Sequence, residues 1–223
     1  MTTEKIYQIA IDGPSGAGKS TIARTVARRL GIDYIDTGAM YRALGLKMLR
    51  QGIPMVEDAR LLAMLEKTDI DFAGGRVYLD GEDVSDLIRT QEISKAASDC
   101  SAFAAVRKKL VELQQKMARA KSVIMDGRDI GTTVFPDAEL KIFVTATPEI
   151  RAQRRYDELK AKGQEASFDE ILENVKQRDY IDRNREVSPL RKADDALLLD
   201  NTDMTIPQQK EWLQEQFNKI VKR

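Results

Sequence analysis

Eight residues near the start of the chain have the types and the spacing that bind a triphosphate. The segment Gly13-Pro14-Ser15-Gly16-Ala17-Gly18-Lys19-Ser20 matches the pattern G-x-x-x-x-G-K-[ST] at every fixed position. Glycines let backbone amides approach phosphate oxygens, lysine bridges the β- and γ-phosphates, and the serine hydroxyl holds Mg²⁺. The segment therefore predicts a nucleoside triphosphate site with Ser20 as a metal ligand.

Asp126 is a candidate for a second group at the metal. It follows Ser122-Val123-Ile124-Met125, an apolar run typical of a buried strand. A carboxylate at such a strand end can reach Mg²⁺ through a water molecule. An ordinary turn residue at the end of a strand is the alternative interpretation that the residues leave open.

The chain contains no histidine, which limits its chemistry. Hydrolysis by a Ser-His-Asp or Cys-His set and zinc held by histidine are excluded, whereas phosphoryl transfer depends mainly on positioning and charge neutralisation. The 36 lysines and arginines balance 36 aspartates and glutamates, which disfavours nucleic acid or a membrane surface as partner. An Asn-Lys-x-Asp guanine-reading motif is absent as well. A kinase of small molecules is favoured, and a nucleotide-dependent switch or RNA-binding protein is the rival from another class.

The arginines indicate that the acceptor is itself a phosphate. A phosphate monoester has a second pKa of ~6, so it is largely a dianion at neutral pH and needs no general base. The two polyanions must instead be held together by permanently charged, bidentate arginines. Arginines are concentrated in three segments where loops are expected to meet, namely 36–42, 126–129 and 178–185.

The elements that would position these residues alternate between strand and helix. A strand at Tyr7–Ile11 leads through the glycine-rich loop into a helix at Lys19–Leu30, which Gly31 ends. Further strands are predicted at 34–36, 123–126, 140–144 and 197–200, and helices at 39–51 and 207–221. The fold class is therefore α/β, with a doubly wound parallel sheet of about five strands.

Two departures from this alternation are predicted. Strands at 69–72 and 76–79 flank Gly74-Gly75, a hairpin turn signal, so an antiparallel insertion lies between 58 and 104. Later, Thr147-Pro148 and Ser167–Glu170 each mark a helix start. The break at 161–166 lies among four arginines and is a hypothetical lid over an anionic ligand; they are Arg151, Arg154, Arg155 and Arg178.

Cysteine usage and the N-terminal residues favour a cytoplasmic protein. Cys100 is the only cysteine and has no partner for an intramolecular disulfide, so it is interpreted as a small buried hydrophobe. Met1-Thr2-Thr3-Glu4 leads into the first strand without the apolar region of a signal peptide. No apolar run approaches the ~20 residues of a membrane-spanning helix.

The three arginine-bearing segments read Asp36-Thr37-Gly38-Ala39-Met40-Tyr41-Arg42, Asp126-Gly127-Arg128-Asp129 and Arg178-Asp179-Tyr180-Ile181-Asp182-Arg183-Asn184-Arg185. These segments resemble bacterial cytidylate kinases, which are nucleoside monophosphate kinases. The resemblance runs along nearly the whole chain and adds 11–21, 81–85, 88–92 and 134–138. It implies a P-loop NTPase fold in a single domain over 1–223. The core would span about 1–37 and 104–223, the inserted nucleoside-monophosphate-binding subdomain about 38–103, and a short helical lid about 154–168.

The resemblance also implies the reaction. The γ-phosphoryl group of ATP, bound with Mg²⁺, would pass to CMP or dCMP, giving ADP and CDP or dCDP in pyrimidine nucleotide metabolism. Another small acceptor, such as UMP, AMP or shikimate, is the alternative among kinases. A monomer is expected, because the resemblance implies it and the sequence has no coiled-coil heptads.

Site residues follow from the resemblance by motif position. The ATP site would comprise Gly13 to Thr21, and the catalytic residues would be Lys19, Arg128, Arg154 and Arg185, with Arg154 touching the transferring phosphoryl group. The CMP site would use Ser98, Arg107 and Asp129 for the base, Arg178 and Asp182 for the sugar, and Arg42, Arg128 and Arg185 for the phosphate, beside Thr37 and Tyr41.

The choice of cytosine has a chemical reason in Asp129. Cytosine presents its N4 amino group as a donor where uracil has a carbonyl, and a carboxylate accepts from the amino group but repels the carbonyl. Ordinary surface residues remain the alternative: a lone helical arginine is usually solvated, and Arg178, Asp182 and Arg185 at i, i+4 and i+7 also fit an ion-pair stripe.

Overall fold

The structure is a computed structural model that describes residues 6–119 and 121–221. Residues 1–4, on which the expectation about a signal peptide rests, lie outside this part. Within the described ranges, no helix combines the length and the apolar character that crossing a membrane requires.

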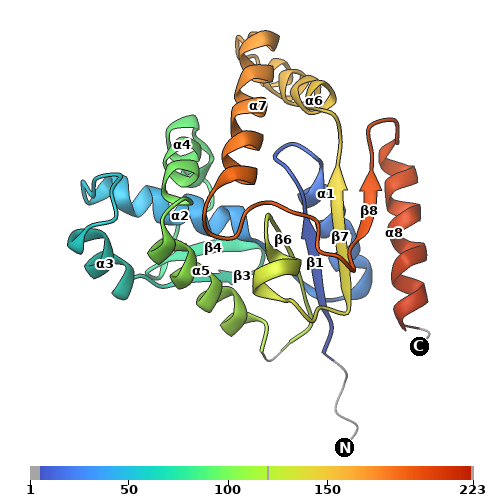
Figure 1. Cartoon of the computed structure of the whole chain (residues 1–223), viewed down its shortest axis with the longest axis horizontal. Helices are drawn as coiled ribbons and strands as arrows, with labels where there is room; N and C mark the ends of the chain where they lie inside the picture. The colour runs from blue at the N-terminus through green and yellow to red at the C-terminus, as the bar shows by residue number, and fades with distance from the viewer. Residues whose placement is uncertain (1–5, 120, 222–223) are drawn as a thin grey trace, which may run out of the picture.

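Five parallel strands form the central sheet, in the spatial order β2-β6-β1-β7-β8 (Figure 1). Their bounds are β1 (Gln8–Asp12), β2 (Asp33–Asp36), β6 (Val123–Gly127), β7 (Leu140–Thr145) and β8 (Leu197–Asp200). β1 lies between β6 and β7, with Ile9 opposite both Ile124 and Leu140. The predicted doubly wound parallel sheet is confirmed, and each predicted strand forms within one residue of its expected bounds.

Alternate side chains of β1 face two separate cores. Ile9 and Ile11 pack with α1 (Lys19–Leu30) and α8 (Ile206–Val221), whereas Ala10 packs with α2 (Thr37–Arg50) and α5 (Ala104–Met117). A parallel sheet needs such a helix layer on each face, because both of its faces are apolar. The sheet thereby holds the loop after β1 at its centre, where the carboxyl ends of the strands meet.

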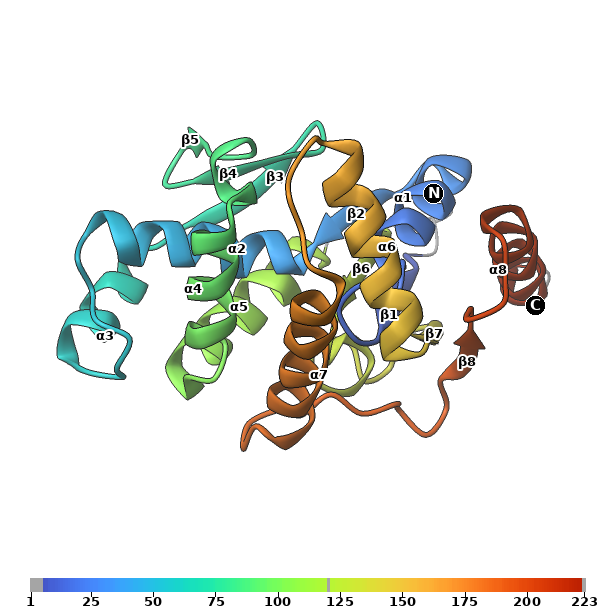
Figure 2. The same ribbon diagram turned by 90° about the horizontal axis from the view of Figure 1, so that it is seen from above.

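The insertion between α2 and α5 contains a small antiparallel sheet (Figure 2). It comprises α3 (Ala59–Glu66), β3 (Ile70–Ala73), β4 (Arg76–Leu79), β5 (Glu82–Asp83), the 3₁₀-helix η1 (Leu87–Arg89) and α4 (Gln91–Cys100). Gly74 and Gly75 both have positive φ, as the predicted hairpin requires. The short strand β5 was not predicted, since two residues carry no periodic signal.

Two helices stand above the carboxyl ends of the strands, α6 (Pro148–Ala161) and α7 (Phe168–Asn184) (Figure 1). Thr147 accepts a hydrogen bond from the Ile150 amide, and Ser167 accepts one from the Glu170 amide, as N-caps do. Contrary to the expected helical spacing of Arg178, Asp182 and Arg185, α7 ends at Asn184. Arg185 has extended backbone angles (φ −64°, ψ 144°), and the chain turns back until the Leu190 amide donates to the Asp182 carbonyl.

One unexpected element follows β6, the π-helical turn η2 (Ile130–Val134). The Asp12 carboxylate at the end of β1 accepts hydrogen bonds from the Ile130 and Gly131 amides, at 2.8 and 2.7 Å. Burial raises the pKa of Asp12 to about 6 despite these two bonds. Asp12 therefore fixes the segment that carries Arg128 and Asp129 against the central strand.

Candidate active site

The loop between β1 and α1 has the backbone of an anion-binding site. Gly13, Gly16 and Gly18 have φ values of +147°, +75° and +87°. An added Cβ at Gly13 would lie 2.0 Å from the carbonyl oxygen of Val144, so only glycine fits there. Gly18 caps α1 without a side-chain hydrogen bond, and the first turn of α1 has no acidic residue. No side chain therefore competes with an anion for the first amides of α1.

Lys19 lies buried beside this loop. Its side-chain nitrogen donates to the Pro14 carbonyl oxygen at 2.8 Å. Burial, together with the nearby Arg128 guanidinium, lowers the pKa of Lys19 to about 7, although Asp126 and Asp182 favour its charged form. An anion seated in the loop would oppose this shift by stabilising the charged ammonium group.

The structure brings together Ser20 and Asp126, the two residues predicted to lie at the metal. The Ser20 hydroxyl donates to Asp126 Oδ2 at 2.9 Å, and the Tyr34 hydroxyl donates to Asp126 Oδ1 at 2.6 Å. Burial, and then the charge of Asp36, raise the pKa of Asp126. Tyr34 was missed by the sequence analysis, because one tyrosine in a short strand gives no signal of a polar contact.

A buried cluster of charges is formed by Arg107 of α5, Asp129 just before η2 and Arg185 just after α7. Arg107 donates a hydrogen bond to Asp129, and Arg185 lies 3.8 Å from the same carboxylate. The Arg107 guanidinium lies over the Tyr41 ring, 5.8 Å from its centroid. Arg107 Nε and Arg185 Nη2 are buried and have no hydrogen-bond partner among the described residues. Buried donors without a hydrogen-bond partner are costly, so they indicate a place for a polar ligand.

A second set of charges connects this cluster to the phosphate loop. Arg128 Nε donates to Asp182 Oδ2 at 2.7 Å, and Arg185 lies 3.7 Å from Asp182. Burial raises the pKa of Asp182, but Arg128, Arg185 and Arg178 together outweigh this effect and hold the pKa below its ordinary value. Burial, and then the charges of Arg128 and Arg42, lower the pKa of Arg178, although Asp182 favours its charged form.

The remaining residues of the predicted acceptor site have varied partners. Arg42 donates to Asp36 at 3.0 Å, and the Thr37 hydroxyl donates to the Asp126 carbonyl oxygen at 2.7 Å. Ser98 is half-buried on α4, and its carbonyl oxygen accepts from the Ser101 hydroxyl. Thr21 is exposed on the first turn of α1. The structure thus gathers the cations at the carboxyl ends of the strands, between the loop and the insertion.

The sequence of the whole chain is similar to curated cytidylate kinases. It is 60% identical over 227 residues to the cytidylate kinase of Bacteroides thetaiotaomicron, covering 98% of this chain and 99% of that protein. It is 52% identical to the cytidylate kinase of Caldicellulosiruptor saccharolyticus, covering 97% and 98%. The family model described as cytidylate kinase matches residues 9–219. The chain belongs to the cytidylate kinase family. The resemblance inferred from the three arginine-bearing segments is thereby confirmed.

A solved structure supports the fold of this cytidylate kinase family member. The uncharacterized protein from Eubacterium ventriosum has a TM-score of 0.51 at 13% identity, covering 98% of this chain and 100% of that chain. At this identity the likeness bears on the fold alone.

Arg154 has a different setting from the other predicted catalytic residues of this cytidylate kinase. Its guanidinium donates to the side-chain and backbone oxygens of Asn201, at 3.1 and 3.0 Å. Asn201 is fully buried and donates to the Ala17 carbonyl oxygen of the phosphate loop at 2.8 Å. Arg154 is therefore held beside the loop through Asn201, which the sequence analysis missed because asparagine after a strand reads as a turn residue.

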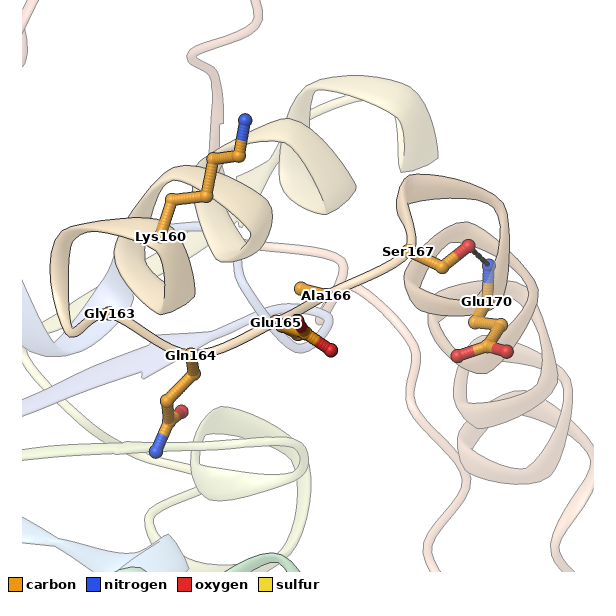
Figure 3. A pocket seen from close by; sticks show the side chains of 7 residues that line it. All are labelled: Lys160, Gly163, Gln164, Glu165, Ala166, Ser167 and Glu170. Atoms are coloured by element: carbon orange, nitrogen blue, oxygen red, sulfur yellow. Dashed lines mark hydrogen bonds between the residues drawn. The ribbon is translucent and has the colours of Figure 1, made fainter.

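The turn between α6 and α7 surrounds a separate hollow of about 650 Å³ (Figure 3). Its lining residues are Lys160, Gly163, Gln164, Glu165, Ala166, Ser167 and Glu170. One cation and two carboxylates line it, so it lacks the positive charge that a nucleotide phosphate requires. We therefore assign no nucleotide to this hollow.

Proposed function

We propose that this cytidylate kinase transfers the γ-phosphoryl group of ATP to CMP or dCMP, producing ADP and CDP or dCDP. The supporting observation is a pair of buried arginine nitrogens, Arg107 Nε and Arg185 Nη2, that have no hydrogen-bond partner among the described residues and lie around Asp129 beside a phosphate-binding loop. A nucleoside monophosphate supplies acceptors for such donors in both its base and its phosphate. Family membership supports the same reaction.

The chemical step needs no general base. An oxygen of the acceptor phosphate attacks the γ-phosphorus, and the bond from that phosphorus to the oxygen of the departing ADP breaks. Lys19 and the loop Gly13 to Thr21 hold the ATP phosphates, and Arg42, Arg128 and Arg185 hold the acceptor phosphate in line. Arg154 exchanges its bonds with Asn201 for the transferring group. These cations offset charge that develops as the phosphoryl group moves.

We assign the remaining acceptor contacts by the resemblance to cytidylate kinases. Ser98, Arg107 and Asp129 bind the base, with Tyr41 and Thr37 beside it, and Arg178 and Asp182 bind the sugar hydroxyls. The segment 38–103 acts as the acceptor-binding subdomain, and 154–168 acts as the lid that closes over the phosphates. Closure excludes water and so limits hydrolysis of ATP.

Mg²⁺ fits the donor set at the loop. The Ser20 hydroxyl and the Asp126 carboxylate are both hard oxygen donors and lie 2.9 Å apart. Among the described residues, no group of three or more carboxylate, cysteine or histidine side chains could hold a metal ion by itself. This suits Mg²⁺, which keeps several waters and takes further oxygens from the nucleotide. When bound, it neutralises charge on the phosphates.

The setting of the reaction follows from the same proposal. We infer a cytoplasmic monomer that acts on small molecules and binds no nucleic acid. The supporting observations are balanced charge and a buried free thiol: burial raises the pKa of Cys100 to about 12, so it stays protonated and unreactive.

An acceptor screen tests the proposed function. The chain is incubated with ATP and MgCl₂, and ADP release is coupled to NADH oxidation with CMP, dCMP, UMP, AMP or shikimate as acceptor. We expect CMP and dCMP to give the fastest turnover. A strong preference for AMP, or ADP release that is equally fast without any acceptor, would contradict the proposal.

Ser98→Ala tests the base pocket without disturbing the fold. The Ser98 hydroxyl forms no hydrogen bond to a described residue, so its removal leaves no buried partner behind. We expect the KM for CMP to rise about three- to tenfold, as for one lost neutral hydrogen bond, with the melting temperature unchanged. Ser94→Ala is the control on the same helix, because its hydroxyl donates to the Thr90 carbonyl oxygen instead. Equal KM values for the two variants would remove Ser98 from the base pocket.

A further inference from the structure

Arg151, one of the four arginines around the predicted lid, is buried and has no role in the reaction proposed above. Its side chain is 1% exposed, at the start of α6. It forms a bidentate ion pair with Asp179 of α7, at 2.8 and 2.5 Å. It also donates to the Ser15 carbonyl oxygen at 3.1 Å and to the Ala146 carbonyl oxygen at 2.9 Å. One guanidinium thus joins the phosphate loop, the end of β7 and α7.

The contact with the phosphate loop is close along the arginine stem as well. A Cβ added at Gly16 would lie 3.3 Å from the Cβ of Arg151, so the loop backbone rests on this side chain. The Ser15 carbonyl and the Gly16 amide belong to one planar trans peptide and point in opposite directions. The Gly16 amide therefore points away from Arg151 and is left to donate to an anion seated in the loop.

Asp179 connects Arg151 to residues of the acceptor site. It lies on α7 between Arg178 and Asp182, and Asp182 in turn accepts from Arg128. Figures 1 and 2 both show α7 between α4 of the insertion and the central sheet. Because a helix rotates as a rigid body over one turn, fixing Asp179 also fixes the directions of Arg178 and Asp182.

We propose that the Arg151–Asp179 ion pair couples triphosphate binding to the order of the acceptor site, with both residues acting as positioning residues. A phosphate bound to the Gly16 amide fixes the Ser15–Gly16 peptide, which fixes the guanidinium and, through Asp179, α7. By linkage, an acceptor held by α7 strengthens triphosphate binding by the same factor. This inference rests on the proposed function, since it needs ATP in the loop and CMP at α7.

Arginine is required for this role because of its geometry. The planar guanidinium offers donors in several directions, and Arg151 uses them for Asp179, Ser15 and Ala146 at once. Lysine keeps the charge, but a point charge cannot hold these three acceptors in fixed directions. Arg151→Lys therefore removes the coupling while it keeps the positive charge next to Asp179.

The test measures CMP affinity by calorimetry, with and without AMP-PNP and MgCl₂. We expect AMP-PNP to strengthen CMP binding at least about fivefold in the unaltered protein, as typical coupling energies give. We expect the ratio to fall to about one in Arg151→Lys and Asp179→Asn, while CMP affinity without AMP-PNP changes much less. Arg60→Lys is the matched control, because Arg60 also donates two hydrogen bonds to one aspartate, Asp58, but does so on the exposed surface at the start of α3. Its ratio should stay that of the unaltered protein.

A folded Arg151→Lys or Asp179→Asn protein that keeps the full ratio would overturn the proposal, as would a ratio of one in the unaltered protein. If the single variants do not fold, Arg151→Met combined with Asp179→Leu provides the measurement, because an apolar pair leaves no unpaired buried charge. CMP turnover by the unaltered protein is measured in the same preparation. Turnover with a ratio of one rejects the coupling alone, whereas absence of turnover rejects the proposed function.

Discussion

Lys19→Met is expected to lower kcat about 10²- to 10³-fold at saturating ATP and CMP, the usual effect of removing one charge-stabilising donor. Lys19 Nζ is buried and bonded to the Pro14 carbonyl oxygen, beside the amides that would hold the phosphates. In the step proposed above, the positive charge of Lys19 stabilises the negative charge that develops on the departing ADP. Initial rates by the coupled ADP assay measure the loss.

The same variant should not damage the fold. The pKa of Lys19 is about 7 in the folded protein and 10.5 ordinarily, so between these values the unfolded chain binds a proton that the folded chain does not. The contribution of Lys19 to the free energy of unfolding therefore rises as the pH increases from about 7 to 10.5. Below pH 7 the buried positive charge of Lys19 destabilises the folded protein. We expect Lys19→Met to melt no lower than the unaltered protein at pH 6, and to gain less on going to pH 9. A variant that melts well below the unaltered protein would mean that the loss of activity reports unfolding.

The strands and the phosphate loop could be predicted because their signals are local. Ile9 and Ile11 face one core and Ala10 faces the other, which gives the alternation of a strand. The loop glycines have positive φ angles, which other residues rarely adopt. The bounds of α2 were less well predicted: the helix begins at Thr37 because the Asp36 carboxylate accepts from the Ala39 amide. An N-cap next to Thr37-Gly38 was overlooked, since glycine lowers the helical signal.

The site residues also divide into those that a local sequence motif predicts and those that depend on contacts between distant segments. Arg42, Arg128 and Arg185 stand in motifs, and the structure gathers them near the carboxyl ends of the strands. Arg151 was predicted to be one of the cations around a lid, but in the structure it is buried in an ion pair with Asp179. Its burial depends on where α7 packs against α6, and long-range packing of this kind leaves no periodic trace in the chain. The contacts of Tyr34, Asp12 and Asn201 were also missed, because each of these residues forms a hydrogen bond to a partner more than 90 residues away in the sequence.

Asp129→Asn should have two large effects, because its carboxylate holds two buried arginines as well as facing the proposed base. Removing one partner of a buried ion pair costs about 3–5 kcal/mol in the free energy of unfolding. Here both Arg107 and Arg185 lose the negatively charged partner beside them, and each already has a buried nitrogen without a hydrogen-bond partner among the described residues. Urea denaturation measures this cost. Asp99→Asn is the control, since its pair with Lys95 is solvent-exposed and is worth at most about 1 kcal/mol.

The second effect is on the choice of base. An asparagine amide can donate to the uracil carbonyl, which a carboxylate repels, so the ratio of kcat/KM for CMP to that for UMP should fall toward one. This ratio is measured at a temperature where urea curves show the variant to be folded. Because both kcat/KM values come from the same preparation, any loss of folded enzyme affects them equally and leaves the ratio unchanged. A folded Asp129→Asn protein that keeps the CMP preference of the unaltered enzyme would show that Asp129 serves only to hold the two arginines. The base would then be read by Ser98 and Arg107, because these are the other two side chains of the proposed pocket.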